Sequence, residues 1–137
     1  MSILAILVSA LVCFIIGFLF HGPLFGKTWM RLAKITPTGN EKLSDMKWQM
    51  FWNYFVNVVC AVFINGAIWI VGATSMFGDI TWYKGAIIAL WLGVGFTIPW
   101  TSIDVIWMGK SWKLWLFDTA SFLLCMMSMG AILAVWR

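Results

Sequence analysis

Four long apolar stretches dominate the sequence, at residues 3–20, 50–73, 85–102 and 114–136. Each is close to the length of about 20 residues that an α-helix needs to cross the hydrocarbon core of a bilayer. None of them alternates apolar with polar residues as the strands of a membrane barrel do. Only 10% of the residues are charged, whereas soluble domains carry roughly 25%. The sequence therefore predicts an all-α fold, a polytopic membrane bundle of four transmembrane helices, in which residues 1–137 form a single domain.

The connection between the first two stretches is the longest, and its first part, residues 24–35, is amphipathic. Lys27, Arg31 and Lys34 recur at helical spacing, while Trp29 lies with apolar neighbours on another face. This pattern is typical of a helix that lies in the headgroup plane with one basic side. We therefore expect an amphipathic interfacial segment between the first and second helices, in contact with lipid through these four residues.

The cations are divided unequally between the two sides of the predicted bundle. The first and third connections together carry seven Lys or Arg residues, whereas the other side carries Lys84 and Arg137. An excess of Lys and Arg marks the cytoplasmic side, so we expect both termini on the non-cytoplasmic side. Tryptophans near both boundaries predict aromatic belts. The net charge of +4 then reports orientation and contact with the lipid bilayer, and no nucleic-acid partner is expected.

Each apolar stretch carries one line of small or polar residues at helical spacing. Small residues let membrane helices approach closely, and polar side chains hydrogen-bond between helices, so packing is one explanation. The other explanation is a polar interior or ligand site, formed by Asp118, Asn53, Asn57, His21 and Asp104. The lines are Ser9, Cys13, Gly17 and His21; Asn53, Asn57 and Asn65 beside Cys60; Thr97, Thr101 and Asp104; and Asp118, Ser121, Cys125 and Ser128.

Asp118 lies about one helical turn inside the fourth stretch. A carboxylate at that depth needs a partner or takes up a proton. The candidate partners are the asparagines of the second helix, Lys113 and His21. An acid within a membrane span is a functional hypothesis, but an acid in the first turn of a helix also interacts with the helix dipole, so both roles stay open. Asp104 is interpreted as a loop or helix-end residue.

We find no group of residues with the spacing of a catalytic or metal site. The three cysteines have no CxxC spacing and are interpreted as small packing residues. His21 is the sole histidine, which predicts a helix-end residue rather than a metal ligand. We see no P-loop and no nucleophile with a base, so we expect no enzyme, no catalytic residues and no cofactor.

Small residues also predict contact with another chain. Ser9, Cys13 and Gly17 follow one another at four-residue spacing, and Gly93 and Gly95 lie close together in the third stretch. A four-helix bundle satisfies only some of these faces internally, and bulky aromatic residues stand beside them. We therefore expect helix packing through these residues and an assembly larger than a monomer.

Two segments carry a resemblance to a known family. Residues 20–29 end the first helix with Phe20, then Leu24-Phe25-Gly26 and Trp29, with one residue more than the family's aromatic-x-x-x-Phe-Gly-x-x-Trp spacing. A short polar turn at 108–113 leads into a helix with an early polar residue and the ending 130–136. These features resemble an uncharacterised family of small four-helix bacterial membrane proteins, domain of unknown function 1761. The resemblance implies four helices and the bacterial inner (plasma) membrane, and it implies no activity.

Two functions remain open at this point. The first is a structural or interaction subunit of a homo-oligomer or a larger membrane complex, with other membrane protein subunits as partners. The second is a protomer of an oligomeric small-molecule or ion transporter or channel that uses Asp118. Four short helices fill their own interior with side chains, so transport would need several copies. The polar signal is weak, and the sequence alone therefore favours the subunit.

Overall fold

A computed structural model describes residues 2–40, 42–74 and 78–136, and these residues form helices and turns without a strand. Four continuous helical segments, Ile3–Leu24, Ser44–Ala73, Trp82–Met108 and Trp112–Val135, are long and apolar enough to cross a membrane. The all-α prediction with four helices of membrane length is confirmed. The elements are α1 (Ile3–Leu19), η1 (Phe20–Leu24), α2 (Gly26–Ala33), η2 (Leu43–Met46), α3 (Lys47–Ala73), α4 (Trp82–Leu92), η3 (Gly93–Thr97), α5 (Ile98–Met108) and α6 (Trp112–Val135).

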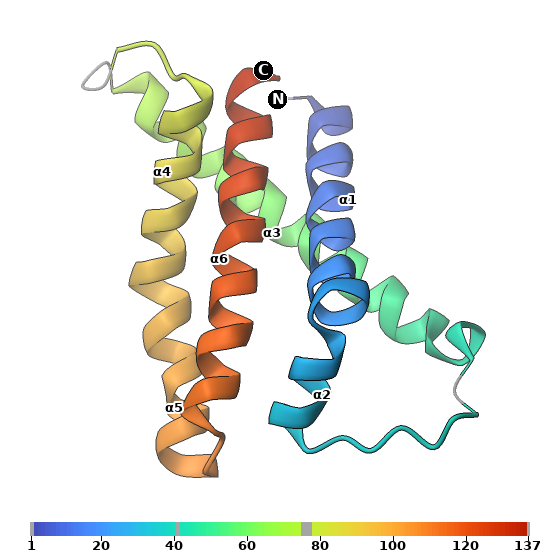
Figure 1. The fold of residues 1–137 in the computed structure, drawn as a ribbon. Helices are drawn as coiled ribbons and strands as arrows, with labels where there is room; N and C mark the ends of the chain where they lie inside the picture. The colour runs from blue at the N-terminus through green and yellow to red at the C-terminus, as the bar shows by residue number, and fades with distance from the viewer. Residues whose placement is uncertain (1, 41, 75–77, 137) are drawn as a thin grey trace.

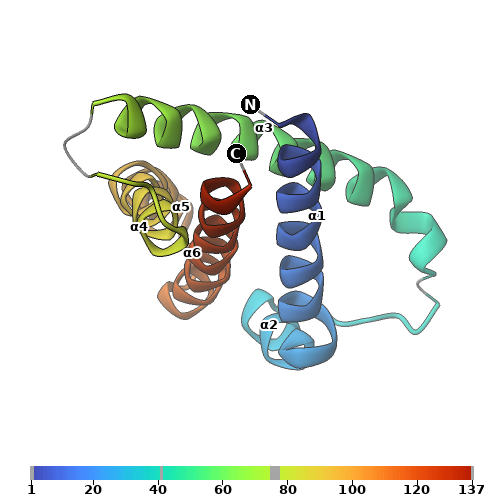
Figure 2. The ribbon, with the colours of Figure 1, turned by 90° about the horizontal axis from the view of Figure 1, so that it is seen from above.

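The helix α6 is the centre of the bundle and contacts α1, α3 and α4. Figure 1 shows α4 and α5 stacked into one column on one side of α6, with α1 on its other side. Figure 2 shows α3 lying across one face of this row of helices. Both ends of the chain lie at the same end of the bundle, and α2 and the turn between α5 and α6 lie at the opposite end (Figure 1). We call the latter the turn end of the bundle.

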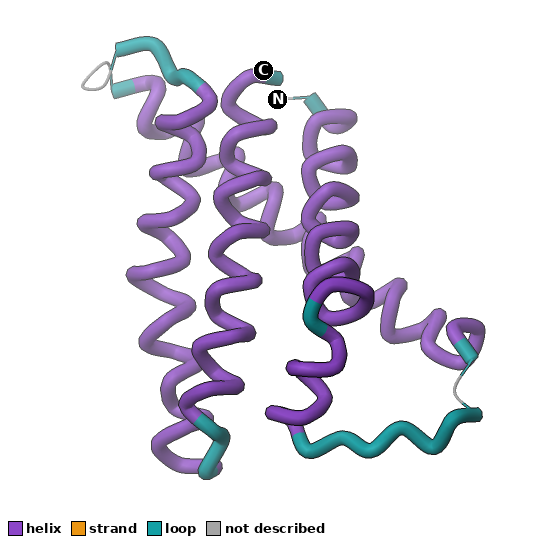
Figure 3. The backbone as a smooth tube through the Cα atoms, in the orientation of Figure 1, coloured by secondary structure: helices purple, strands orange, loops and turns teal. Residues whose placement is uncertain are grey.

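The long segment between α2 and η2 follows this same turn end as an extended loop (Figure 3). It begins at Lys34, which ends α2 in the left-handed conformation with φ 57°. The N–H of Ile35 then bonds the carbonyl oxygen of Met30 at 2.9 Å, which satisfies a carbonyl at the end of the helix. Thr38 and Glu41 have the spacing of a capping box, which predicts that a helix begins there, but Glu41 lies outside the described residues. The helical conformation resumes at Leu43 and continues into α3, so the second long helix begins earlier than residue 50.

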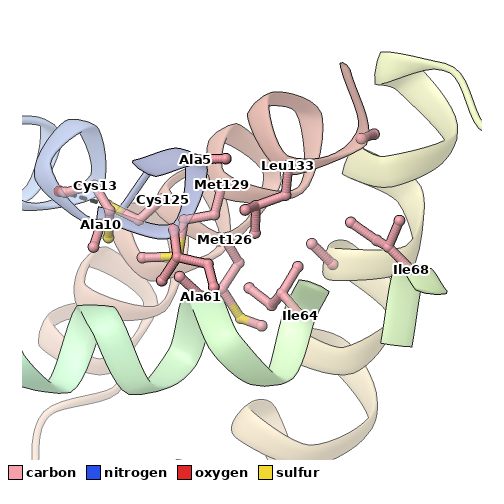
Figure 4. Packing of buried hydrophobic residues seen from close by; sticks show 13 residues of the cluster. Ala5, Ala10, Cys13, Ala61, Ile64, Ile68, Cys125, Met126, Met129 and Leu133 are labelled. Atoms are coloured by element: carbon pink, nitrogen blue, oxygen red, sulfur yellow. Dashed lines mark hydrogen bonds between the residues drawn. The ribbon is translucent and has the colours of Figure 1, made fainter. Parts of the chain in front are cut away.

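The apolar core lies between α1, α3, α4 and α6. Ile64 and Ile68 of α3 and Met129 and Leu133 of α6 are almost completely buried. Figure 4 shows Ile64, Met129 and Leu133 in the space between α3 and α6, with Ala5 and Ala10 of α1 nearby and Ile68 farther along α3. Alanines at the contact points bring the helix backbones close together. This core lies on the side of the bundle where the chain ends, and it closes the interior there.

The closest contact between helices is the crossing of α4 and α6. A Cβ atom added at Gly85 would collide with the carbonyl oxygen of Gly130 and the Cβ of Ala134. A Cβ atom added at Gly130 would collide with the carbonyl oxygen of Gly85 and the Cβ of Ala89. Only glycine leaves room for two backbones at this distance. The two pairs, each a glycine followed four residues later by an alanine, therefore hold α4 against α6.

Two π-helical turns interrupt the long helices, and each accompanies a proline. Pro99 lies in the first turn of α5, directly after η3, and Pro23 lies within η1. Proline has no N–H and its ring collides with the carbonyl four residues earlier, so the helix widens locally instead of keeping its regular hydrogen bonds. Pro99 lies inside the third apolar stretch, where a proline is expected to distort the helix, and the widened turn η3 is the form of this distortion in the structure.

Candidate functional site

A partly open cavity of about 380 Å³ lies between α1, α3 and α6 at the turn end of the bundle. Cavities of 300–1,000 Å³ are the usual size for small-molecule sites. The lining combines polar side chains from all three helices with aromatic and methionine side chains. The lining residues are Cys13, Phe14, Gly17, Phe18 and His21 from α1 and η1; Met46, Gln49, Met50, Asn53 and Asn57 from η2 and α3; and Asp118, Ser121, Phe122 and Cys125 from α6.

Asp118 is held from two sides at the edge of this cavity. The Lys110 ammonium donates to Oδ2 of Asp118 at 2.9 Å, and Nε2 of His21 lies 3.3 Å from Oδ1. All three side chains are about a third exposed. We call these residues the His21–Asp118–Lys110 cluster. It joins the end of α1 to the beginning of α6 and to the turn before it.

The hydrogen bonds of His21 fix where its protons lie. Nδ1 is 3.0 Å from the carbonyl oxygen of Gly17, and a carbonyl oxygen only accepts, so Nδ1 carries a proton. The contact between Nε2 and Asp118 then needs one more proton, because a neutral imidazole and an ionised carboxylate would both be acceptors there. The geometry therefore assigns one proton to the pair of His21 and Asp118. With the ammonium of Lys110, the cluster carries a net charge of +1 whichever partner holds that proton.

A left-handed glycine brings Lys110 to Asp118. Gly109 ends α5 with φ 69°, a conformation that glycine adopts without strain. The N–H of Lys110 then bonds the carbonyl oxygen of Asp104 at 3.2 Å, which satisfies one of the carbonyl groups at the end of the helix. This reversal turns the chain back toward α6, so the Lys110 side chain reaches an acid eight residues later.

Aromatic rings hold His21 against α6. The ring of Phe117 lies edge-on to the imidazole with centroids 5.6 Å apart, and Trp29 of α2 lies edge-on at 5.5 Å. Phe20 packs against Phe117 at 4.8 Å and against Phe25 at the same distance. Edge-on and tilted pairs at these separations are favourable arrangements. The aromatic packing therefore orients the imidazole and attaches α2 to the end of the bundle.

A chain of hydrogen bonds runs along the wall of the cavity and links three helices. The thiol of Cys125 donates to the carbonyl oxygen of Cys13 at 3.5 Å, and the thiol of Cys13 donates to Oδ1 of Asn57 at 3.4 Å. Nδ2 of Asn57 donates in turn to Oδ1 of Asn53 at 3.2 Å. All three cysteines are free. The two buried cysteines thus take part in the polar wall as well as in packing.

Four of the five residues predicted to form a polar interior line this one cavity, namely His21, Asn53, Asn57 and Asp118. Asp104 is not among the lining residues. The helix that carries Asp104, α5, bonds α6 at another point. There the indole N–H of Trp115 on α6 donates to the hydroxyl of Thr101 on α5 at 3.1 Å.

The residues predicted for helix packing lie in three different environments: the buried interior, the cavity wall and the exposed surface. Ser9 and Cys13 are buried within the chain, and a Cβ at Gly93 would meet Leu123 and Met126 of α6. A Cβ at Gly17 or Gly95 would meet nothing within 4 Å. Gly17 lines the cavity, and Gly95 is exposed and lines an apolar groove between α3 and α4.

Sequence reasoning did not find two parts of the site. The partner lysine of Asp118 is Lys110 rather than Lys113, because the turn at Gly109 sends Lys110 back toward α6. Met46 and Gln49 also line the cavity, although the second apolar stretch was taken to begin at residue 50. A signal for both was present, in the glycine after Met108 and in the helical spacing that continues from Asn53 back to Gln49 and Met46.

The fold and the cavity together define a small helical protein with four membrane-length helices and a pocket with polar groups between α1, α3 and α6. The chain belongs to the family described as "Protein of unknown function (DUF1761)", which matches residues 4–134. The resemblance noted in the sequence is therefore confirmed. No curated protein and no solved structure matches the chain. In the described part of the chain, no three His, Cys, Asp or Glu side chains gather in the way that a metal ion requires.

Proposed function

We propose that this protein is an integral membrane protein that binds a small ligand in the cavity between α1, α3 and α6. The observation that carries the proposal is the convergence of His21, Asn53, Asn57 and Asp118, from three helices, on one partly open cavity. Polar and ionisable groups within membrane helices are expensive and usually mark a pathway or a site. Packing alone would have paired these side chains without leaving a cavity of about 380 Å³ between them.

Ligand exchange through this cavity would make the chain a protomer of an oligomeric small-molecule or ion transporter that uses Asp118. The cavity reaches only the turn end of the bundle, because Ile64, Met129 and Leu133 fill the interior beyond it. A path through the bundle therefore needs a surface formed with another copy. We propose binding rather than catalysis, because the acid and the base of the cluster bond one another and Lys110.

A second candidate function is that of a structural or interaction subunit in a homo-oligomer or larger membrane complex. The observation that favours it is the outward aromatic face at the beginning of α3, where Trp48 is 67% exposed and Phe51 is 52% exposed. Trp52 and Phe55 continue this face, with ring centroids 5.6 Å apart. Aromatic side chains are enriched where proteins meet.

The proposed setting is the bacterial inner (plasma) membrane, with the turn end in the cytoplasm and both termini on the other side. The cation excess of the connections at the turn end supports this orientation. In this setting α2 is the amphipathic segment in the headgroup plane. Lys27 and Arg31, which are exposed, would meet lipid phosphates, while the half-buried Trp29 packs inward. Lys34 would extend this basic side, and the tryptophans near each boundary would form the aromatic belts.

A cavity-filling substitution tests the proposed binding. Gly17→Leu places a side chain in the cavity without a collision at its Cβ, so the fold is retained and the ligand space is lost. Gly66→Leu is the matched control, because Gly66 lies on α3 outside the cavity and its Cβ would also meet nothing within 4 Å.

The measurement is native mass spectrometry of the protein purified in mild detergent, which reports small molecules that remain bound. We expect bound molecules on the wild type and on Gly66→Leu, and none on Gly17→Leu. Equal adducts on all three proteins would remove the cavity as the binding site. The masses of any co-purifying subunits in the same spectra address the second candidate function.

A further inference from the structure

We infer that the cavity binds an amphiphile with an apolar chain and a single anionic head, a carboxylate or a phosphate monoester. This inference rests on the proposed function and adds to it the chemical class of the ligand. It follows from the charge of the cluster, from the donors beside it and from the apolar remainder of the lining.

The charge of the His21–Asp118–Lys110 cluster is the first step. His21 donates from Nδ1 to the carbonyl oxygen of Gly17, and its contact with Asp118 requires a second proton between the two side chains. Lys110 adds a full positive charge. One carboxylate therefore faces two positive equivalents, and the excess of +1 at the cavity edge attracts an anion and repels a cation.

The donors of the cluster and of the cavity wall are the second step. Lys110 is not among the residues that line the cavity, so its ammonium group acts on the cavity through its charge and through its bond to Asp118. Oδ1 of Asn53 accepts from Asn57, and the Nδ2 group of Asn53 supplies two N–H donors in the cavity wall. Gln49 and Ser121 line the same cavity and can also donate. An anionic head in the cavity would meet these donors and the net positive charge of the cluster, which would repel a cationic head.

The apolar part of the lining is the third step. Phe14 and Phe18 of α1, Met50 of α3 and Phe122 of α6 form the remainder of the wall together with Met46. Methionine and phenylalanine side chains adapt to flexible apolar chains. A small inorganic anion would leave these side chains without contacts, so the lining fits an anion that carries an apolar tail.

The charge around the turn end supports the same sign of ligand. The two connections at that end carry seven Lys or Arg residues and three Asp or Glu residues. Such an excess raises the local concentration of anions and speeds their association.

The experiment uses four photoactivatable probes with the same sixteen-carbon chain and different heads, namely carboxylate, phosphate monoester, alcohol and trimethylammonium. The full-length protein is reconstituted in phosphatidylcholine nanodiscs, and labelled peptides are mapped by mass spectrometry. We expect the anionic probes to label the cavity segments at about tenfold lower concentration than the alcohol, because hydrogen bonds that involve a charged group are stronger than those between neutral groups. The carboxylate and phosphate probes separate a fatty-acid type of ligand from a lipid phosphate.

Two lysine substitutions provide a matched pair. Lys110→Gln should reduce labelling by the anionic probes to the level of the alcohol. Lys113→Gln removes the same charge from an exposed residue three positions away and should leave labelling unchanged. Lys110→Arg keeps the charge and should keep the preference for anions. A folded Lys110→Arg variant without that preference, or equal losses in Lys110→Gln and Lys113→Gln, would overturn the inference.

The outcomes separate this inference from the proposed function. Equal labelling of the cavity by the anionic probes and the alcohol, abolished by Gly17→Leu, would overturn the anionic head while the binding cavity stands. Preference for the trimethylammonium probe would also overturn it and would indicate a cationic ligand. If no probe labels the cavity, the inference fails, and if native mass spectra of the wild type also show no bound molecule, the proposed function fails with it.

Discussion

Asp118 illustrates how a single acid among apolar residues is stabilised by partners distant in the sequence. His21 arrives from the end of the first long helix, 97 positions earlier, and Lys110 arrives through the left-handed turn at Gly109. The need for a partner follows from the desolvation of a carboxylate, so it could be predicted from the sequence, as could His21 as one candidate. Lys110 rather than Lys113 pairs with Asp118 because Gly109 adopts a left-handed backbone conformation. The positions of the charges in the sequence do not reveal that conformation.

Asp118→Asn should leave the fold nearly intact. Each contact of Asp118 is partly exposed, and polar contacts between membrane helices contribute only about 0.6 kcal/mol on average. We expect a loss of about 1 kcal/mol or less in the free energy of unfolding, measured by titration with sodium dodecyl sulfate in mixed micelles. Asp104→Asn, outside the cavity, is the control and should have less effect. A loss of several kcal/mol for Asp118→Asn would show that the cluster is mainly a structural element.

The same substitution separates transport from binding. If an ion or a proton crosses the protein at Asp118, Asp118→Asn should abolish the flux while the folded protein is retained. The measurement is flux of protons and small ions into liposomes that contain equal amounts of wild type and variant. Equal flux in both would remove the proposed transporter, whereas the binding cavity would not be affected by that result.

At the scale of helices, the sequence predicts the number and length of the long elements better than their contacts. Each of the four long apolar stretches contains at least one glycine, and these glycines look alike in the sequence. The structure uses Gly85 and Gly130 for a backbone crossing, Gly93 against Leu123, Gly17 in a cavity wall and Gly95 on the outside. Which glycine meets a neighbour depends on the rotation and tilt of whole helices, and these are set by packing of all elements together.

The crossing of α4 and α6 yields a prediction about stability. Gly85→Ala and Gly130→Ala each force the two backbones apart, because their new Cβ atoms would collide with a carbonyl oxygen. Excess volume in a packed interior costs about 1–3 kcal/mol, and we expect a loss of at least that size in the free energy of unfolding. Gly66→Ala, where the added Cβ meets nothing within 4 Å, should be neutral or slightly stabilising, because alanine favours helices. Equal effects at Gly66 and Gly85 would contradict the crossing as described.

At the scale of the whole molecule, the bundle has a closed half and an open half. Ile68 and Leu133 fill the half where the chain ends, whereas the cavity and its cluster occupy the turn end. The lines of polar residues in the first, second and fourth stretches meet in that open half, as a polar interior requires. The third line lies elsewhere, because α4 and α5 pack on the other side of α6. The helical spacing of small and polar residues predicts the polar line on each helix. It does not predict which of these lines will face one another in the bundle.

The common position of both ends of the chain yields a prediction about topology. A periplasmic reporter fused after Arg137 should be active, and a cytoplasmic reporter at the same position should be silent, because cations gather at the opposite end. A reporter inserted at Gly39, in the exposed loop of the turn end, should behave in the opposite way. Activity of the cytoplasmic reporter after Arg137 would reverse the proposed orientation and place the turn end outside.

Assembly is the last prediction, and α3 is the element on which it depends. The beginning of α3 turns Trp48, Phe51, Trp52 and Phe55 outward in an aromatic ladder. Lipid can cover such a face, but rigid aromatic side chains also form the centres of protein interfaces. We expect a photo-crosslinking residue at Trp52 to capture a second chain in native membranes. The same residue at Leu116, which is also outward on α6, is the control and should capture mainly lipid.

The pattern of crosslinks distinguishes the two candidate functions. Capture of an identical chain at Trp52 would support a homo-oligomer and a shared surface beside the cavity, whereas capture of a different protein would support a subunit of a larger complex. Phe51→Ala together with Phe55→Ala should reduce either product, because removal of two aromatic anchors weakens an interface more than it changes a lipid-covered face. Gly17→Leu should leave the crosslinks unchanged, since Gly17 lines the cavity. A chain that runs only at monomer mass under all these conditions would end both the assembly prediction and the subunit function, and ligand binding by the single chain would remain.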